Sequence, residues 1–447
     1  MTDLCDTATS ARLNPPAVRW PRLLQGLAFA FLRDRAMRHW IKRYGRVFEI
    51  DVPVFGRSVV VSDPALVREV CTATGEQLGN VEPNLGNWFG PGSTFALDGS
   101  RHRIRRRLLT PALHGEALRN IESVIEEETL RECANWQQHS EFRTLEPMTR
   151  ITLNVILRVI FGAESTDLDD LRTRVPKYLR RGELLAFLTA PSGPARRYSP
   201  WAKLDGFRVE WNDAVQKAIT RAEADADLDT RVDLIAFLAR VRRDDDSAIG
   251  ITDVCDELLT LLCAGHETTA AGLAWTVERL RRHPAVLADL VYEADQGGSA
   301  LRRATIVESM RVRTVIDVFG RRVASSQFVL GGWRIAGGST VLVRVADLHR
   351  DPEVFTNPEQ FDPYRFIGAR AAQANWLPFG GGSRRCLGSA FAMAEMDVVL
   401  KTILRHFKIG TDAARDEKMT FGGVAHSPKL GARVEVQRRR RGLCPER

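Results

Sequence analysis

Cys386 follows a glycine-rich segment that could hold a metal-containing group. Residues 379–388 read FGGGSRRCLG. The three glycines permit a tight turn and a close approach to a bulky, flat partner. We expect Cys386 at the start of the last helix, where free N–H groups and the helix dipole favour the metal-ligating thiolate. The alternative is a glycine loop with an incidental buried cysteine. A phosphate loop is disfavoured, because no Lys-Ser/Thr follows the glycines.

A second segment, residues 264–272, contains an acidic residue next to a residue with a hydroxyl group. We expect this segment to lie inside a helix that begins near Thr252. Glu267 next to Thr268 could relay protons to a bound oxygen species. Gly265 costs a helix roughly 1 kcal/mol relative to alanine, which is understandable if something planar packs there. The alternative is a helix-packing glycine beside a surface glutamate. A lone helical histidine such as His266 is more typical of an exposed or core position than of a metal ligand.

A third pair, Glu308 and Arg311, has the i, i+3 spacing of one helical face. Such a pair is usually a surface salt bridge worth roughly a few tenths of a kcal/mol. Arg365 could join the two in a buried network, and spacing alone leaves both interpretations open.

The composition is that of a globular protein: 447 residues, 44% hydrophobic and 27% charged. No apolar run approaches the roughly 20 residues of a membrane span, and none is a convincing secretory signal. The seven cysteines are scattered without a C-x-x-C pair, which indicates reduced thiols and excludes c-type haem attachment. We therefore expect a cytoplasmic protein. The net charge of +8 lacks the motifs of a nucleic-acid binder, so no nucleic-acid partner is expected.

The periodicity predicts one large, mostly helical unit with a smaller β portion. Residues 47–54 and 58–62 are expected to form a hairpin, and residues 333–335 and 341–345 a second one across Gly337-Gly338. Helices are expected to dominate up to about Arg282. An apolar stripe at 3/4 spacing marks a last helix around residues 396–407. We expect a single domain over residues 1–447, with a basic, frayed tail at residues 438–447.

The three chemical segments occur together, and on them the chain resembles the cytochrome P450 superfamily of haem-thiolate monooxygenases, of the soluble bacterial and actinobacterial type. Three family motifs, in the family's order along the chain, carry the resemblance. The haem loop F-x-x-G-x-[RH]-x-C-x-G matches at Phe379, Gly382, Arg384, Cys386 and Gly388. The oxygen-activation motif [AG]-G-x-[DE]-T-[TS] matches at Ala264, Gly265, Glu267, Thr268 and Thr269, and E-x-x-R matches at Glu308 and Arg311, with Arg365 as the partner arginine.

The resemblance implies a mainly α fold with a smaller β portion (α+β), a single P450-like fold around a buried haem b. It implies Cys386 as the proximal axial ligand and Glu267 and Thr268 as catalytic residues that manage protons on the opposite, distal side. Ala264, Gly265, Phe379, Gly382 and Gly388 would contact the cofactor. Partners of the haem propionates are implied at His102, Arg106, Arg322 and Arg384, and structural roles at Glu308, Arg311 and Arg365.

The resemblance also implies dioxygen, a lipophilic small-molecule substrate, and electrons from a separate ferredoxin and ferredoxin reductase, or from flavodoxin. Arg105, Arg107 and Arg385 are candidates for docking an acidic ferredoxin. Residues 79–96, 184–188 and 424–426 are candidates for lining the substrate pocket. The family usually has a proline-containing stretch after E-x-x-R, and residues 312–319 have no proline. Alternative functions are a haem-thiolate peroxygenase, isomerase or dehydratase, and a haem-binding sensor that does not turn over.

Overall fold

The computed structural model describes residues 14–81, 85–137, 139–162, 167–185, 191, 193–245, 249–368, 375–422 and 424–439. Contacts divide the chain into two compact units. The smaller unit comprises Met1–Asn84, Val318–Leu348 and Gly380–Arg384, and the larger unit comprises Leu85–Asp317, His349–Phe379 and Arg385–Arg447.

The smaller unit is built around a five-stranded sheet in the order β1-β2-β8-β5-β3. The predicted first hairpin is confirmed: β1 (Val47–Val52) pairs antiparallel with β2 (Gly56–Val61) around a turn at residues 53–55. Because β2 also pairs parallel with β8, its valines are buried, as is expected of an inner strand. The other elements are α1 (Arg22–Phe31), α2 (Arg33–Tyr44), α3 (Pro64–Thr72), β3 (Leu78–Gly79), β5 (Val318–Val323), β8 (Thr340–Arg344), α14 (Val345–Leu348) and the short 3-10 helix η5 (Gly382–Arg384).

The predicted second hairpin is wrong in its pairing. Strand β7 (Trp333–Ala336) does form a hairpin, but with β6 (Gln327–Leu330), through the turn at Gly331 and Gly332. Strand β8 lies instead in the five-stranded sheet between β2 and β5. Gly331-Gly332 and Gly337-Gly338 both favour turns, so the turns alone do not determine which strand pairs with β7. Every residue of β8 is buried, and an isolated two-stranded hairpin could not bury it in this way.

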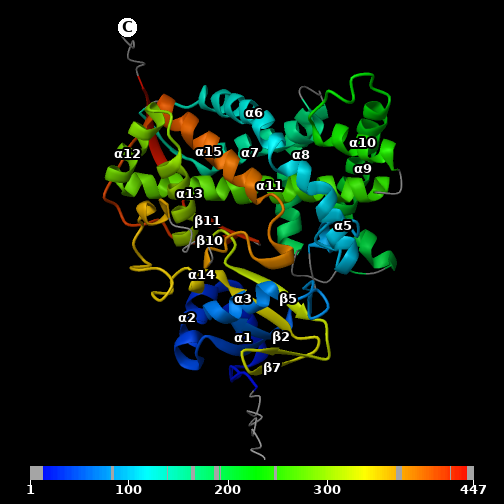
Figure 1. Cartoon of the computed structure of the whole chain (residues 1–447), viewed down its shortest axis with the longest axis vertical. Coiled ribbons are helices and arrows are strands. Elements are labelled where there is room, and N and C mark those ends of the chain that lie inside the picture. The colour runs from blue at the N-terminus through cyan, green and yellow to red at the C-terminus, as the bar shows by residue number, and fades with distance from the viewer. Residues whose placement is uncertain are drawn as a thin grey trace, which may run out of the picture. The chain divides into compact units, whose positions relative to one another are not determined.

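The larger unit is mostly helical, and its central element is the 32-residue helix α11 (Ile251–Arg282). Helices α7 and α15 both lie against α11 (Figure 1). The predicted last helix is confirmed as α15, and its apolar stripe from Met396 to Leu404 is buried. The helices of this unit are α4 (Gly86–Phe89), α5 (Gly99–Leu109), α6 (Glu116–Cys133), α7 (Leu145–Phe161), α8 (Asp167–Leu185), α9 (Trp201–Glu223), α10 (Leu234–Asp244), α11, α12 (Pro284–Asp295), α13 (Ala300–Val312) and α15 (Ser389–His406), with 3-10 turns η1 (Thr110–Leu113), η2 (Gly193–Tyr198) and η3 (Pro363–Phe366).

Two small sheets complete the larger unit: β4-β12-β9, formed by Glu141–Arg143, Arg433–Arg438 and Phe407–Ile409, and β10-β11, formed by Met419–Gly422 and Ala425–Pro428. The basic C-terminal segment is thus ordered at its start. Arg438 ends β12, and Arg439 forms an ion pair with Asp295 at 2.6 Å. Residues 440–447 lie outside the described residues.

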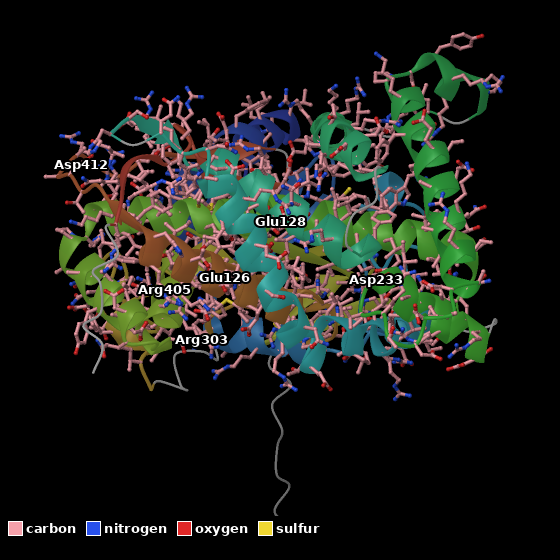
Figure 2. The ribbon with its side chains drawn as sticks, turned by 90° about the horizontal axis from the view of Figure 1, so that it is seen from above. Glu126, Glu128, Asp233, Arg303, Arg405 and Asp412 are labelled. Carbon is pink, nitrogen blue, oxygen red and sulfur yellow. The ribbon has the colours of Figure 1, made fainter. Side chains whose placement is uncertain are left out.

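Charged side chains cover the outside of the larger unit. Figure 2 labels Arg303 on α13 and Arg405 on α15, both exposed. Glu128 on α6, labelled in the same view, is an exception because it is fully buried, and Arg131 and Arg158 neutralise it at 2.6 and 2.9 Å. In the part of the chain that the structure describes, no helix is both long and apolar enough to span a bilayer.

Candidate active site

The cysteine loop is shaped by its glycines and tied to Phe379. The backbone N–H of Cys386 donates to the carbonyl oxygen of Phe379 at 2.9 Å, which closes the loop before α15 begins at Ser389. Within the smaller unit Gly382 has φ +68°, and a Cβ there would overlap the carbonyl oxygen of Cys71. A glycine is therefore required at position 382 by both conformation and space.

Cys386 is an exposed residue, in contrast to the buried thiols of Cys133, Cys255 and Cys263. Desolvation by the surrounding protein raises the pKa of the Cys386 thiol. A hydrogen bond from the Gly388 backbone N–H and the positive charges of Arg106 and Arg385 act in the opposite direction. These three groups stabilise a thiolate, and a bound cation would complete that stabilisation.

The surroundings of Cys386 fit a metal that brings most of its own ligands. Among the described residues there is no group of three or more His, Cys, Asp or Glu side chains that could hold a metal ion. A single cysteine thiolate is the protein ligand that haem iron takes in this kind of site, since a porphyrin supplies the iron's other ligands. The donor set thus fits a haem better than a zinc or iron–sulfur site.

The oxygen-activation motif lies in the middle of α11, in the stretch of this helix that is least completely buried. From residue 254 to residue 280 this helix is buried, except at Leu261, Ala264, Gly265, Glu267 and Thr268. Of these, residues 261, 264, 265 and 268 share one face at helical spacing. The helix is therefore only partly buried at this motif, and it is fully buried on either side of it.

Two features of the partly buried face of α11 concern what could bind there. The Thr268 hydroxyl donates to the carbonyl oxygen of Ala264 at 2.8 Å, which leaves its lone pairs free to accept a hydrogen bond. A Cβ at Gly265 would meet only Ile156, at an ordinary contact distance of 3.7 Å. The protein's own packing therefore does not require a glycine at this position.

Glu267 does not point alone into solvent, as a surface glutamate would. The carboxyl group of Glu183 on α8 is close enough for each of the two carboxyl groups to influence the pKa of the other. Burial raises the pKa of Glu267, and burial together with the neighbouring Glu267 raises the pKa of Glu183 to about 8. Sequence analysis missed Glu183, because nothing in its spacing within α8 connects it to a motif more than 80 residues away.

His266 is a core histidine, as its sequence context favoured. It is fully buried, and its Nδ1 lies 2.9 Å from the carbonyl oxygen of Leu262. Desolvation lowers its pKa to about 4, so the ring is neutral at physiological pH. It belongs to the packing of α11 and is no metal ligand in this structure.

Glu308 and Arg311 form a buried network, so the surface salt bridge that such spacing usually indicates is not what occurs here. Neither side chain is exposed, and Arg311 binds both carboxylate oxygens of Glu308, at 2.7 and 2.8 Å. Arg365 joins the network, with its Nε 3.3 Å from Glu308 Oε1. The remaining donors of Arg311 bind three backbone carbonyl oxygens, those of His349, Pro358 and Gln360.

This network is connected to the segment that leads into the cysteine loop. The buried His349 accepts a hydrogen bond at Nε2 from the backbone N–H of Leu377, at 3.0 Å, and its Nδ1 lies 3.0 Å from Thr314 Oγ1. The indole N–H of Trp376 donates to the carbonyl oxygen of Val307 on α13, at 3.0 Å. Helix α13 thereby fixes the chain immediately before Phe379.

The four residues expected at the propionates are placed on regular elements. His102 is buried and Arg106 half-buried, one turn apart on α5 of the larger unit. Arg322 lies on β5 and Arg384 in η5, both in the smaller unit. Arg106 is close enough to Cys386 to influence its thiol.

Arg105 was wrongly grouped with the docking arginines. Its side chain is only 7% exposed, and it binds Asp253 at 2.6 Å, Glu257 at 3.3 Å and the carbonyl oxygen of Gly92 at 2.7 Å. It holds the loop before α5 to the start of α11. Arg107 and Arg385 are exposed, as docking requires.

The residues expected to line the substrate pocket differ in how far they are buried, and some of them lie outside the described residues. Trp88 and Phe89 are buried and stacked, with ring centroids 4.7 Å apart. Residues 186–188 and the side chain of Leu184 lie outside the described residues. His426 is half-buried, with its Nε2 3.3 Å from Asp317 Oδ1.

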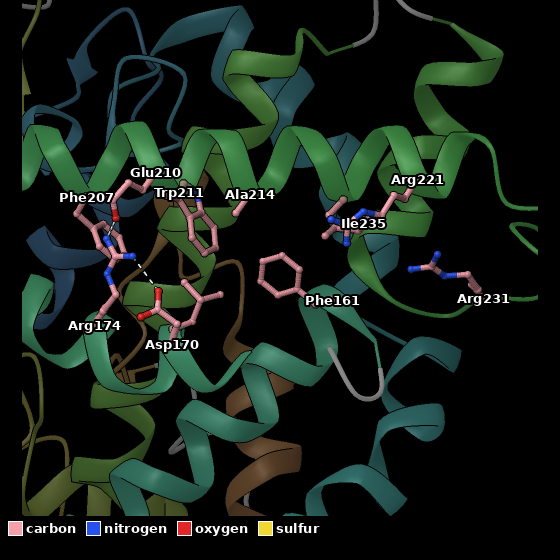
Figure 3. A pocket seen from close by; sticks show the side chains of 12 residues that line it. Phe161, Asp170, Arg174, Phe207, Glu210, Trp211, Ala214, Arg221, Arg231 and Ile235 are labelled. Atoms are coloured by element: carbon pink, nitrogen blue, oxygen red, sulfur yellow. Dashed lines mark hydrogen bonds and ion pairs between the residues drawn. The ribbon is translucent and has the colours of Figure 1, made fainter. Parts of the chain in front are cut away.

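A cavity of about 310 Å³ lies elsewhere in the larger unit, between α7, α8, α9 and α10. Figure 3 shows Phe161 and Trp211 within it and Arg174 between Asp170 and Glu210, to which it is ion-paired. None of its lining residues belongs to the three motifs, so this cavity is separate from the candidate active site.

Comparison with known proteins agrees with this geometry. The sequence model of the family described as Cytochrome P450 matches residues 15–433. Over 425 residues the chain is 50% identical to the Mycobacterium tuberculosis protein named cytochrome P450 138, which covers 95% of this chain and 96% of that protein. It is 35% identical over 442 residues to cytochrome P450 135B1 of the same species, with 96% and 93% covered.

Two solved structures share the fold. A retinoic acid-bound cyanobacterial CYP120A1 superposes with a TM-score of 0.81 at 20% identity, covering 95% of this chain and 99% of that one. The haem domain of cytochrome P450DA superposes with a TM-score of 0.79 at 22% identity, covering 96% and 98%. The expected mainly α fold with a smaller β portion is thereby confirmed.

Proposed function

The chain belongs to the cytochrome P450 family, and on that premise we propose that it inserts one oxygen atom from dioxygen into a lipophilic small organic substrate. It is a haem-thiolate oxidoreductase whose cofactor is haem b with a cysteine axial ligand. We further propose that electrons come from a separate ferredoxin and ferredoxin reductase, or from flavodoxin, and that the protein works in the cytoplasm. The free thiols at all five described cysteines support a reducing compartment.

When bound, the haem supplies dioxygen activation, with O–O cleavage favoured by electron donation from the thiolate. Cys386 would hold it, with the Gly388 N–H and the charge of Arg106 stabilising the sulfur. In our proposal His102, Arg106, Arg322 and Arg384 bind the propionates through charge-assisted hydrogen bonds. The Glu308–Arg311–Arg365 network would keep the cysteine loop in place, because it fixes the segment before Phe379.

The observation that best supports a monooxygenase is the restricted opening of α11. Between residues 254 and 280 of this helix, only Leu261 and four motif residues, Ala264, Gly265, Glu267 and Thr268, are not fully buried, whereas the fifth motif residue, Thr269, is buried. Thr268 can accept a hydrogen bond there, and burial raises the pKa of the neighbouring Glu267 carboxyl, which favours its protonated form. An enzyme that needed no proton delivery would have no evident use for an acid with a raised pKa next to a hydroxyl that can accept a hydrogen bond.

The test compares two threonines of the same helix. Thr268 and Thr276 both donate to the carbonyl oxygen four residues back, at 2.8 and 2.9 Å, but only Thr268 lies in the opening. Lipophilic compounds that shift the haem absorption would be turned over with ferredoxin, its reductase and NADPH. We expect Thr268→Ala to consume NADPH with peroxide in place of product, and Thr276→Ala to stay coupled.

Other results would point to other functions. Equal coupling in both variants would contradict the proposed proton delivery. Product formed from peroxide or without any electron donor would indicate a peroxygenase or an isomerase. Ligand binding without turnover in every condition would indicate a sensor.

A further inference from the structure

An exposed apolar surface lies on and around α1, the first helix of the smaller unit. In the described part of the chain, sixteen large hydrophobic side chains are exposed, and six of them fall between Trp20 and Leu32. These six are between 45% and 79% exposed, and the other ten are spread over the rest of the chain. Single exposed apolar side chains need no explanation, whereas a contiguous group of this size marks a binding surface.

Four of the six side chains form a stripe along the outside of α1, here called the outer stripe. It consists of Leu23, Leu24, Leu27 and Phe31. Their spacing of three and four residues places them on one face of the helix. The residues of α1 that are buried, Gln25, Ala28 and Phe29, belong to its other side. Helix α1 therefore has two apolar sides, and the smaller unit buries only one of them.

The buried side holds α1 on the hairpin formed by β1 and β2. The side-chain oxygen of Gln25 accepts a hydrogen bond from the backbone N–H of Asp51 on β1, at 2.9 Å. Gly26 packs so closely on Pro53, in the turn of the hairpin, that a Cβ at this position would overlap the proline ring. The outer stripe takes no part in these contacts, so its side chains can be replaced while the attachment of the helix is kept.

The chain around the outer stripe is strongly basic. Between residues 19 and 43 there are seven arginine and lysine residues and one acidic residue, Asp34. Six of the seven are exposed: Arg19, Arg22, Arg35, Arg38, Lys42 and Arg43. Arg22 pairs with Asp51 at 3.2 Å and Arg38 with Asp34 at 2.8 Å, and exposed pairs of this kind are weak. The excess of positive charge favours an anionic partner for this surface.

We propose that α1 and the start of α2 bind the surface of an anionic phospholipid membrane, with the outer stripe inserted at the boundary between headgroups and acyl chains. Leucine and aromatic side chains on one face, together with nearby arginine and lysine, are typical of helices that lie in this interface. Anionic lipids provide the negative charge that the basic residues attract. A second copy of this chain would instead bring like charges together. The inference goes beyond the proposed monooxygenase function and does not depend on it.

Flotation of the haem-loaded protein with vesicles tests the outer stripe. We expect binding to vesicles of phosphatidylglycerol and phosphatidylcholine at low salt, and binding to pure phosphatidylcholine that is weaker by about tenfold or more. Leu23→Ser and Phe31→Ser should each weaken binding to the anionic vesicles by about tenfold, because each removes a large apolar side chain from the lipid. Tyr292→Ser is the matched control, since Tyr292 is 70% exposed on α12, and it should bind as the unmodified protein does.

The same assay tests the charges. Arg35→Gln and Lys42→Gln should each weaken binding to the anionic vesicles roughly fivefold, and high salt should reduce this difference. Arg303→Gln, which removes an exposed arginine from α13, should have no effect. Circular dichroism of each variant should match that of the unmodified protein, because the contacts of the buried side of α1 are kept.

Two results would overturn the inference. The first is equal binding to the anionic vesicles by the unmodified protein, Leu23→Ser and Phe31→Ser, or no binding by any of them. The second is a dimer that forms without lipid in sedimentation velocity and dissociates in Phe31→Ser, which would show that a second copy covers the stripe. None of these measurements needs substrate or a redox partner, so their result is independent of whether monooxygenase activity is found.

Discussion

Arg311 donates Nε–H and Nη2–H to the two carboxylate oxygens of Glu308 at 2.7 and 2.8 Å, and neither side chain is exposed to solvent. Removing one partner of a buried pair leaves the other charge uncompensated. We expect Glu308→Gln and Arg311→Leu each to lower the free energy of unfolding by about 3–5 kcal/mol. The measurement is denaturant unfolding of the haem-loaded protein.

Arg303→Gln is the matched control, because Arg303 lies on the same helix. Its ion pair with Asp397 spans 3.6 Å, and 66% of its side chain is exposed. A long ion pair with an exposed arginine contributes little, about 0–1 kcal/mol. If Arg303→Gln and Arg311→Leu lowered the free energy of unfolding equally, burial would not determine how much these ion pairs contribute to stability.

The two glycines at 382 and 388 should respond differently to alanine, although both are fixed positions of the haem-loop motif. Gly382 has φ +68° and a Cβ there would overlap the Cys71 carbonyl oxygen, whereas Gly388 has φ −85° and no neighbour within 4 Å of a Cβ. We expect Gly382→Ala to lose the red-shifted absorption of the reduced, carbon monoxide-bound haem. Gly388→Ala should retain it, and loss in both variants would contradict the steric argument.

Acid should destabilise the protein through His349. Desolvation lowers its folded-state pKa to about 3, against an unfolded value of 6.5, so the unfolded chain binds more protons between these limits. The stability present above pH 6.5 is therefore lost as the pH falls toward 3, by about 1.4 kcal/mol per pH unit for one fully buried histidine. His349→Gln should flatten this slope in denaturant titrations at several pH values. The exposed His39 provides the comparison: His39→Gln should leave the slope unchanged.

Docking of an acidic ferredoxin should depend on Arg107. This side chain is exposed on α5, next to Arg106, which acts on the Cys386 thiol. We expect Arg107→Glu to slow reduction by ferredoxin several-fold at low salt, with the difference vanishing at high salt. Arg405→Glu is the control, because Arg405 is exposed at the far end of α15, about 24 Å along the helix from its first residue, Ser389. Unchanged reduction in Arg107→Glu would exclude this docking site.

The sequence alone identified the residue types on which the chemistry depends. These residue types occur in local patterns: Cys386 after its glycines, Glu267 next to Thr268, and Glu308 three residues before Arg311. Such a pattern is visible in the sequence whatever the rest of the fold, because it depends only on one loop or one helix. The first hairpin and the last helix were predictable for the same reason, because hydrophobic periodicity records which face of an element is buried.

The tertiary structure determined the burial and the contacts of these residues. Whether the Glu308–Arg311 pair lies on the surface or in the core depends on which carbonyl groups close around Arg311. Arg105 has the same side chain as Arg107, but three partners distant in sequence bury it. Strand β8 left its expected hairpin for a sheet that buries it completely. Each of these outcomes depends on contacts between segments far apart in the chain, and no local pattern contains that information.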